Sequence, residues 1–503
     1  MNEIFEISFQ AQKKDNYWKI FKDSFRRIVM EEKLLNVQGF IFFTVFTILF
    51  SIGIAQGGLV FGILVTVGLI AIPAVVALVI SPQFGIIVYI TLAYVIMFLL
   101  RLGVTFPLGT LMDGMLVLFF LGFFIQQKRK PRWDLVSGPV SLWILIWIIY
   151  NFIEVANPAA ESRLSWVYTV RTVAFVGLSY FIYLYNIRTK AFIKLILKLW
   201  VFLSMVGAVY AFKQEFIGFF PFEEEYIHSP GMPLLLFIAG HWRKFSIYSD
   251  CVTFAYQMAI ASLLCIALLK GPLARYKKLI LIFCSAVIMV AMIFSGTRGA
   301  FPLVPATLII YAILNYSKKI LIFVIVAAVF IVGLIFLPTS NQNILRFQSA
   351  FRPNEDLSYK VRKINQARIK PYVWAHPIGG GLGATGEWGK KFAPGSFLSD
   401  FPPDSGYVRV TVELGWIGLA IFCIMMFVIL KTGINNYYRI RDPELKSYCL
   451  AAILVVFALN IANFPQEALV QFPSNVYFYL AIALMNVTYR LDQEQNLMID
   501  AKK

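Results

Sequence analysis

Long apolar runs alternate with short polar segments along most of this sequence. A run of about 20 apolar residues is long enough for a helix to cross the hydrocarbon layer of a bilayer, and on that basis we expect about fourteen spanning helices. The expected spans are 38–55, 58–80, 84–100, 110–125, 137–154, 164–185, 192–214, 248–270, 279–295, 299–316, 320–336, 406–430, 447–464 and 472–489. The pattern therefore predicts an all-α, polytopic transmembrane helix bundle.

Two polar stretches between the apolar runs, 216–247 and 337–405, are much longer than the others. They divide the chain into a basic N-terminal segment (1–37), helices 1–11 (38–336), the long loop 337–405, helices 12–14 (406–489) and a tail (490–503). Within the first segment, residues 16–34 place large apolar side chains on one helical face, which is typical of a helix lying on a membrane surface. Because long loops in compact membrane domains are often functional, we expect the chemistry in 337–405.

Lysine and arginine gather in alternate connections between the spans, at 126–132, 186–190, 270–278, 318–319 and 431–446. The short connections on the other side, 154–161 and 463–472, contain glutamate and neither lysine nor arginine. Cytoplasmic loops carry the excess of basic residues in membrane proteins. We therefore expect both termini in the cytoplasm and both long loops on the opposite face. The basic charge of 337–405 does not contradict this topology, because long loops are translocated regardless of charge.

Composition excludes a soluble globular domain. Hydrophobic residues make up 59% of the 503 residues and charged residues only 14%, against about 25% charged in soluble domains. The net charge of +18 follows from the basic residues that flank the spans, so we expect no nucleic-acid partner. The sequence lacks the pattern of a cleavable signal peptide at its start, and its five cysteines lie in apolar segments, as small buried hydrophobes do.

Familiar cofactor and metal motifs are absent or misplaced. Residues 381–386 match the dinucleotide pattern GxGxxG, but no strand precedes them and they fall in an extracytoplasmic loop, so we reject that interpretation. Lys390 is followed by Lys391 rather than Ser or Thr, which excludes a phosphate-binding loop. The three histidines are scattered. We expect no metal site and no cofactor.

Arginines near the outer ends of the spans are the main candidates for binding an anion. Arg171 lies within a span, and Arg298 lies between two spans with glycines on both sides. Charged residues in spans usually face a cavity or a partner, and a snorkelling side chain or a structural ion pair is the alternative for both. Arg243 stands just before a span, and Arg368 lies in the basic loop. If these two converged with Arg171 and Arg298, the four would suit a diphosphate, because a guanidinium binds phosphate oxygens with two parallel hydrogen bonds. Singly, each is a solvated loop charge.

Asp404 is the candidate acid or base. It stands directly before the span that begins near residue 405, where capping the helix N-terminus is the alternative role. Arg409 and Glu413 have the i,i+4 spacing of an ion pair that would neutralise two charges within the span.

Several segments together resemble the O-antigen ligase and O-antigen polymerase superfamily of bacterial envelope enzymes. Ser295-Gly-Thr-Arg-Gly-Ala300 is similar to the family's Arg-Gly-Ala signature, and Ala375-His-Pro-Ile-Gly-Gly-Gly-Leu-Gly383 to its glycine loop. Asp404-Ser-Gly-Tyr-Val-Arg-Val-Thr-Val-Glu-Leu-Gly-Trp-Ile-Gly418 is similar to its helix start, and Arg243 with Ser249-Asp-Cys-Val-Thr-Phe-Ala255 to a weaker fourth motif. Arg368 and Gly379 match the Arg-x10-Gly loop of polymerases. The likeness covers residues 240–430, in the family's order.

The resemblance implies a glycosyltransferase of the bacterial inner membrane that needs no metal and acts at the periplasmic face. Its substrates would be an undecaprenyl-diphosphate-linked oligosaccharide donor and a glycan acceptor, with membrane lipid and other polysaccharide-export proteins as further partners. Arg243, Arg298, Arg368 and Arg171 would bind the diphosphate, Asp404 and Arg298 would be catalytic, and Trp374, Trp388 and Tyr407 would stack on sugar rings.

One departure from the family bears on which reaction is expected. Asp404 stands where ligases carry a histidine. This difference favours a polymerase of O-antigen or exopolysaccharide repeat units over a ligase that transfers glycan to the lipid A core. A lipid-linked oligosaccharide or solute transporter is the alternative from another class, since it would also explain many spans and intramembrane arginines.

Overall fold

The computed structural model describes residues 81–500, apart from 105, 130, 239, 341, 350 and 352–356, together with 37, 40–41, 44–52, 55 and 77–79. The chain divides into two compact units, Met1–Ala77 and Leu78–Lys503. In the first unit, residues 44–52 are helical. The expected surface helix at 16–34 and most of the expected span 58–80 lie outside the described residues.

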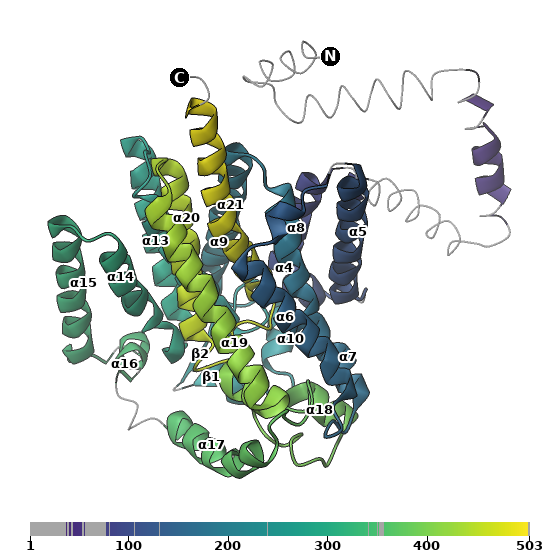
Figure 1. Ribbon diagram of the computed structural model, residues 1–503. Coiled ribbons are helices and arrows are strands. Elements are labelled where there is room, and N and C mark those ends of the chain that lie inside the picture. The colour runs from purple at the N-terminus through teal and green to yellow at the C-terminus, as the bar shows by residue number, and fades with distance from the viewer. Residues whose placement is uncertain are drawn as a thin grey trace. The chain divides into compact units, whose positions relative to one another are not determined.

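The second unit is a bundle of helices (Figure 1). Its first half contains α4 (Pro82–Arg101), α5 (Leu108–Arg129), α6 (Pro139–Ile153), α7 (Arg163–Val173), α8 (Ser179–Asn186) and α9 (Lys190–Phe216), with 3-10 turns η2 (Trp133–Val136), η3 (Glu154–Ala156) and η4 (Phe175–Leu178). The connection that follows holds α10 (Pro221–Ile227), α11 (Met232–Leu236) and a two-stranded antiparallel hairpin, β1 (Phe237–Ile238) and β2 (His241–Trp242), in which Phe237 pairs with Trp242.

The second half contains α12 (Cys251–Leu268), α13 (Arg275–Phe294), η5 (Arg298–Ala300), α14 (Leu303–Leu314) and α15 (Lys318–Phe336). The long loop then forms α16 (Gln342–Ser349), α17 (Leu357–Ala375) and α18 (Gly386–Phe392). Three helices complete the chain: α19 (Gly406–Arg439), α20 (Pro443–Ala462) and α21 (Ser474–Asp500). The expected all-α architecture is confirmed.

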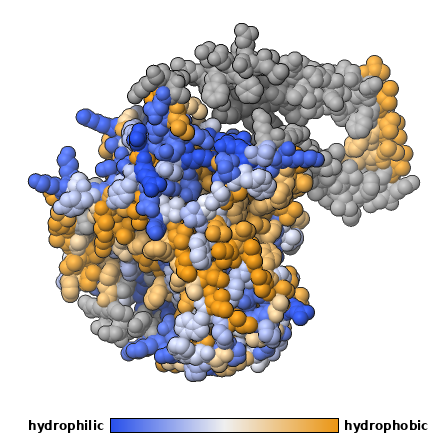
Figure 2. Space-filling view, viewed as in Figure 1, coloured by the Kyte–Doolittle hydropathy of each residue, from blue (hydrophilic) through white to orange (hydrophobic). Residues whose placement is uncertain are grey.

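Nine helices of the described part are long and apolar enough to cross a membrane, and Arg298–Leu314 and Ile325–Phe336 are shorter apolar helices. Figure 2 shows hydrophobic residues gathered around the middle of the helices and hydrophilic ones toward their ends. Many large apolar side chains are exposed, among them Phe202, Leu279 and Phe283. Such a surface is stable in lipid and not in water, so the protein is a membrane protein.

The centre of the bundle consists of α12, α20 and α21, in each of which most residues are buried. α21 corresponds to the expected span 472–489, but it is more polar than the nine apolar helices named above. Its Asn475 is buried in the packed interior, and its Asn486 is partly buried. α19 packs against α6, α20 and α21. The arrangement leaves α17, α18 and the β1–β2 hairpin at one end of the bundle and the C-terminus at the other (Figure 1). We call the first of these the loop end.

One expected span is interrupted. Residues 164–185 form two helices, α7 and α8, with the 3-10 turn η4 between them. A methyl group built on Gly177, in that turn, would lie 3.2 Å from the ring of Tyr479 on α21. Close packing of α21 against the turn therefore accompanies the break. The apolar composition of residues 164–185 gives no reason to expect a break.

Candidate functional site

α19 is broken at Gly415, near the loop end. Gly415 has φ +67° and ψ −166°, a conformation open almost only to glycine. The break exposes backbone groups that would otherwise bond within the helix. They pair instead with the loop before α18: Gly380 N donates to Val412 O (2.9 Å), Gly381 N to Glu413 O (2.9 Å), and Trp416 N to Pro377 O (2.8 Å). Unwound backbone is tolerated at membrane depth where it is satisfied by protein in this way.

The glycines of residues 379–383 permit this close approach. A methyl group on Gly379 would lie 2.5 Å from the Glu413 carbonyl carbon, and one on Gly381 would lie 2.5 Å from Ala160 Cβ. These glycines pack the loop against α19 and the segment before α7, and they are not arranged around a nucleotide. We call residues 377–383, together with the unwound turn at 412–416, the glycine lock.

The Arg298 turn is held by Arg243. The Arg243 guanidinium donates to Ser295 O (2.8 Å), Leu235 O (3.1 Å) and Thr297 Oγ1 (2.9 Å). Thr297 in turn donates to Cys251 O (3.0 Å), which joins the turn to the start of α12. The two arginine motifs predicted to work together therefore lie side by side. Arg298 itself is half-buried in η5.

Asp404 lies beside Arg362 of α17. Arg362 Nε is 3.9 Å from Asp404 Oδ2, and both side chains are partly exposed, 29% and 37%. Partial burial raises the pKa of the Asp404 carboxyl, and the positive charge of Arg362 opposes that rise. The capping role considered from sequence is not observed, because α19 begins at Gly406 and its N-cap is Ser405.

The connection between α20 and α21 links Asp404 to the Arg298 turn. Gly406 N donates to Asn463 O of this connection (2.9 Å), and a methyl group built on Gly299 would lie 3.2 Å from the ring of Pro465. The Tyr256 hydroxyl oxygen of α12 lies 3.1 Å from the same methyl position, and Tyr256 interacts electrostatically with Arg362. Arg243, Tyr256, Arg298, Arg362 and Asp404 therefore form one cluster, which we call the arginine–aspartate site.

A second charged network braces the start of α19. Arg409 Nε lies 3.1 Å from Glu413 Oε2, and Arg409 also forms an ion pair with Glu467. Glu413 Oε1 accepts a hydrogen bond from the Thr385 hydroxyl at 2.6 Å. The predicted pairing of Arg409 with Glu413 is present. The network joins α19 to Thr385, which follows the glycine lock, and to Glu467 in the α20–α21 connection.

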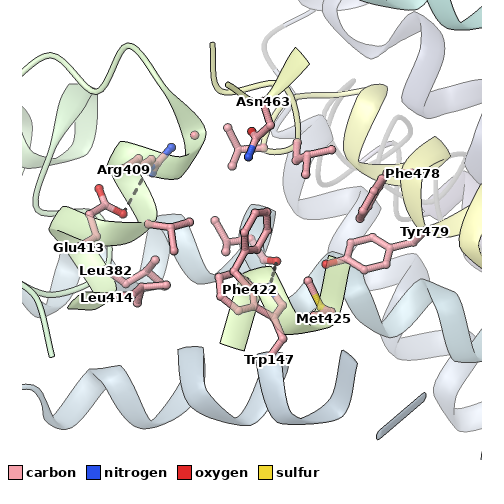
Figure 3. A pocket seen from close by; sticks show the side chains of 15 residues that line it. Trp147, Leu382, Arg409, Glu413, Leu414, Phe422, Met425, Asn463, Phe478 and Tyr479 are labelled. Carbon is pink, nitrogen blue, oxygen red and sulfur yellow. Dashed lines mark hydrogen bonds and ion pairs between the residues drawn. The ribbon is translucent and has the colours of Figure 1, made fainter. Parts of the chain in front are cut away.

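Figure 3 shows a small cavity beside this network, between Arg409 and Glu413 on one side and Trp147, Phe422, Phe478 and Tyr479 on the other. Its volume is about 40 Å³, enough for water but not for a sugar ring. Most of its wall is apolar. The cavity is therefore a packing feature behind the site and not the place of a saccharide.

The other predicted residues have partners elsewhere in the protein. Arg171 forms an ion pair with Asp113 of α5, the structural alternative considered for it. Arg368 lies on the exposed face of α17, its guanidinium carbon 5.6 Å from the centre of the Phe397 ring. Neither residue is brought into the arginine–aspartate site by a contact of its own.

The three aromatic candidates are packed to different degrees. Trp388 stacks on Tyr168 at 4.6 Å, and Tyr407 donates a hydrogen bond to the Asn460 side chain. Trp374 is 65% exposed, with one neighbouring ring, Trp416, at 5.1 Å. Only Trp374 presents a broad open face of the kind that stacks on a sugar.

Sequence reasoning missed two members of the site. Arg362 was one of nine basic residues in the long loop, and nothing in its immediate sequence distinguishes it. Tyr256 lies five residues after Cys251 in an apolar span, where a tyrosine looks like an ordinary core residue. Its place directly after the predicted motif Ser249–Ala255 was the available signal.

Among the described residues, no group of three or more His, Cys, Asp and Glu side chains is placed to hold a metal ion. The arginine–aspartate site has the carboxylate of Asp404 beside the guanidinium of Arg362, and Arg243 and Arg298 are further cations of the site. An excess of positive charge repels a metal ion and attracts an anion.

Residues 279–423 match a family model described as O-Antigen ligase. The matched segment contains the Arg298 turn, α17, the glycine lock and Asp404. An O-antigen polymerase from Salmonella muenchen is 22% identical over 404 residues, which is 76% of this chain and 96% of the relative. The predicted resemblance is confirmed. The likeness to the O-antigen ligase and polymerase superfamily thus extends over most of the chain, and the family model covers most of the segments that build the site.

Proposed function

We propose that the protein is a glycosyltransferase that polymerises lipid-linked oligosaccharide repeat units at the extracytoplasmic face. The observation that carries this proposal is the arginine–aspartate site, in which Arg362 lies beside the Asp404 carboxylate and Arg243 holds the turn of Arg298. Arginines together with a carboxylate suit a reaction whose leaving group is a diphosphate and whose nucleophile is a hydroxyl. The similarity to an O-antigen polymerase supports the choice of substrate.

In the proposed reaction, a hydroxyl of the acceptor glycan attacks the anomeric carbon of the donor sugar. The bond between that carbon and the diphosphate oxygen breaks, and undecaprenyl diphosphate leaves with the bonding electrons. Asp404 takes the hydroxyl proton. Its raised pKa, caused by partial burial, brings the carboxylate closer to the basicity a general base needs.

The arginines have different parts in this proposal. A guanidinium has five N–H donors, and Arg243 uses three of them on Ser295, Leu235 and Thr297. Arg243 therefore mainly positions the turn that carries Arg298, and Arg298 and Arg362 neutralise the diphosphate. We do not extend the proposal to Arg171 and Arg368, because Asp113 and Phe397 respectively account for their positions.

A ligase is the second candidate, because the matching family model is described as O-Antigen ligase. The two reactions share the donor and differ in the acceptor. Asp404 occupies the position where the resemblance places a histidine in ligases, and this difference favours polymerisation. The same experiment distinguishes them.

The test uses purified protein in lipid vesicles with undecaprenyl-diphosphate-linked repeat units, and separates the saccharide products on a gel. We expect a ladder of lengthening chains from the wild type. Asp404→Asn should lower kcat by about 100-fold or more because it removes the general base. Arg298→Gln should lower it by about 100- to 1,000-fold because it removes a charge-stabilising donor.

Arg368→Gln is the matched control for Arg362→Gln, because both arginines lie on α17 and only Arg362 contacts Asp404. We expect Arg362→Gln to reduce the ladder and Arg368→Gln to leave it near wild type. Transfer of saccharide to added lipid A core without lengthening would establish the ligase instead. Movement of the lipid-linked substrate across the vesicle with no new glycosidic bond would favour a transporter and reject both reactions.

A further inference from the structure

A cavity of about 370 Å³ lies at the end of the bundle opposite the loop end, toward the C-terminus (Figure 1). Its walls come from η2 and the start of α6, from α8, and from the C-terminal half of α21. We call it the α6–α21 cavity. It shares no residue with the arginine–aspartate site, and its volume is sufficient for a small polar ligand.

The most buried part of the lining is polar. The hydroxyls of Ser141 and Tyr180 lie 3.0 Å apart, and the Asn486 side chain donates to the Tyr180 oxygen (3.2 Å). Cavities that stay empty in proteins have apolar walls, whereas a polar cavity of sufficient size holds water or a polar ligand. The α6–α21 cavity is therefore suited to a polar occupant.

The charged side chains of the lining balance one another. Arg132 and Arg490 supply the positive charges, and Asp134 and Glu494 supply the negative ones. Arg132 Nη2 lies 3.6 Å from Glu494 Oε1, and Arg490 Nε lies 3.9 Å from the same oxygen. Both separations are longer than a hydrogen bond, so these groups keep capacity for a ligand. A lining with charges of both signs suits a ligand that also carries both.

The two arginines differ in how far they are already used. Arg490 donates to Leu184 O (2.7 Å) and Ile187 O (2.6 Å), so it fastens the end of α8 to α21. Arg132 lies at the rim, where its side chain is 41% exposed, and within the described part of the chain its guanidinium has the ion pair with Glu494 and no hydrogen bond. Arg132 is therefore the arginine available to a ligand phosphate.

The position of the cavity indicates where the ligand comes from. The cavity lies at the start of the stretch Pro139–Ala156 and near the end of Arg163–Asn186, both long and apolar enough to cross a membrane. The ends of such stretches lie at the depth of the lipid headgroups. Beyond the cavity, α6 carries the exposed apolar side chains Leu142, Leu145 and Ile149 on one face, along which an acyl chain can lie.

We propose that the α6–α21 cavity binds the zwitterionic headgroup of a membrane phospholipid with a primary amine, of the phosphatidylethanolamine class. The headgroup phosphate lies against Arg132, and the ammonium donates to the carboxylates of Asp134 and Glu494. A primary ammonium has three N–H donors for these carboxylates. The quaternary ammonium of phosphatidylcholine has none, and phosphatidylglycerol has no ammonium. This inference is independent of the proposed function.

The experiment measures binding of phosphatidylethanolamine, phosphatidylcholine and phosphatidylglycerol, with identical acyl chains, to the purified full-length protein by native mass spectrometry. The variants are Glu494→Gln and Arg132→Gln. Asp500→Asn is the matched control, because Asp500 is an exposed acid on the same helix, α21, and lies outside the lining. Arg490 is left unchanged because it fastens α8. Thermal unfolding is measured with and without each lipid.

Loss of a hydrogen bond to a charged group corresponds to about a 10- to 100-fold change in affinity. We expect the wild type to prefer phosphatidylethanolamine over the other two lipids by a factor in this range. Glu494→Gln should weaken phosphatidylethanolamine alone, whereas Arg132→Gln should weaken all three, because each has the phosphate. Asp500→Asn should match wild type. Phosphatidylethanolamine should raise the unfolding temperature of the wild type more than that of Glu494→Gln, because a ligand stabilises the state that binds it.

Several results would overturn the inference. Equal binding of the three lipids would mean that the ammonium is not recognised, and tighter binding of phosphatidylglycerol would make the cavity an anion site. An unchanged preference in both Glu494→Gln and Arg132→Gln would place the lipid elsewhere on the protein. Water-soluble glycerophosphoethanolamine that binds as tightly as the lipid would show that the acyl chains contribute nothing, and would exclude a lipid as the selected ligand.

Discussion

The glycine lock gives a prediction that can be worked out from geometry. Gly415 has φ +67° and ψ −166°, and any other residue there is strained by about 1–3 kcal/mol. A Cβ at this position would also overlap the Pro377 carbonyl oxygen, so Gly415→Ala must push the loop away from α19. Three backbone hydrogen bonds hold that loop, from Gly380, Gly381 and Trp416.

Each of those hydrogen bonds contributes about 1 kcal/mol net, so Gly415→Ala should destabilise the lock by about 4–6 kcal/mol in all. Gly395→Ala is the matched control within the same long loop. Gly395 also has a positive φ, +85°, but a methyl group there meets open space. Only the cost of a left-handed residue applies, about 1–2 kcal/mol.

Thermal unfolding of the purified protein in detergent measures the difference, and limited trypsin digestion locates it. Lys390 and Lys391 are exposed on α18, in the part of the loop that follows the lock. We expect Gly415→Ala to unfold several degrees below Gly395→Ala and to be cut faster at these lysines. Equal unfolding temperatures and equal cleavage rates for the two variants would refute the structural role of the lock.

Three further predictions concern the charged residues. Arg362→Gln removes the cation that holds down the pKa of Asp404. Because Asp404 must lose its proton to act as a base, the acidic limb of the pH profile of kcat/KM should move to higher pH. An unmoved limb would exclude Asp404 as the titrating base. Asp113→Asn leaves Arg171 without its counter-charge and should lower the free energy of unfolding by about 2–4 kcal/mol. The double variant with Arg171→Gln should recover part of that loss. No recovery would mean that the two side chains do not stabilise each other as an ion pair. Thr385→Val removes a 2.6 Å hydrogen bond to the Glu413 carboxylate and should lower stability by about 1.5–3 kcal/mol in the same assay. Thr411→Val is the control on the same helix as Glu413 and should cost less, because the Thr411 hydroxyl donates to the neutral carbonyl of Tyr407.

Spanning helices were predictable because their cause is local. A run of apolar residues long enough to cross a bilayer also forms a helix, so the expected spans 84–100 and 192–214 correspond to α4 and α9. The break between α7 and α8 was not predictable in this way. It coincides with the packing of Tyr479, three hundred residues further along the chain, against Gly177.

The site was predictable in part for the same reason. Arg298 is marked by its glycine neighbours and by its place between two spans, and Asp404 by its place at the start of one. Arg362 is distinguished from the other basic residues of its loop only by the fold of α17, which turns it toward Asp404 while Arg368 faces Phe397. A sequence gives the charge of such a loop but not which of its charges meets the carboxylate.

The arginine–aspartate site is carried by two kinds of support. Tyr256 and the Arg298 turn belong to helices packed in the bundle, whereas Arg362 lies in the long loop and Asp404 at its end. The glycine lock fastens that loop to α19, eleven residues beyond Asp404 along the chain. The proposed catalysis requires the residues of the bundle helices and those of the long loop to stay at a fixed separation, because a small misplacement of a base or charge costs much of the rate. Gly415→Ala should therefore lower kcat at least as much as Arg362→Gln does, although Gly415 has no side chain and lies outside the site.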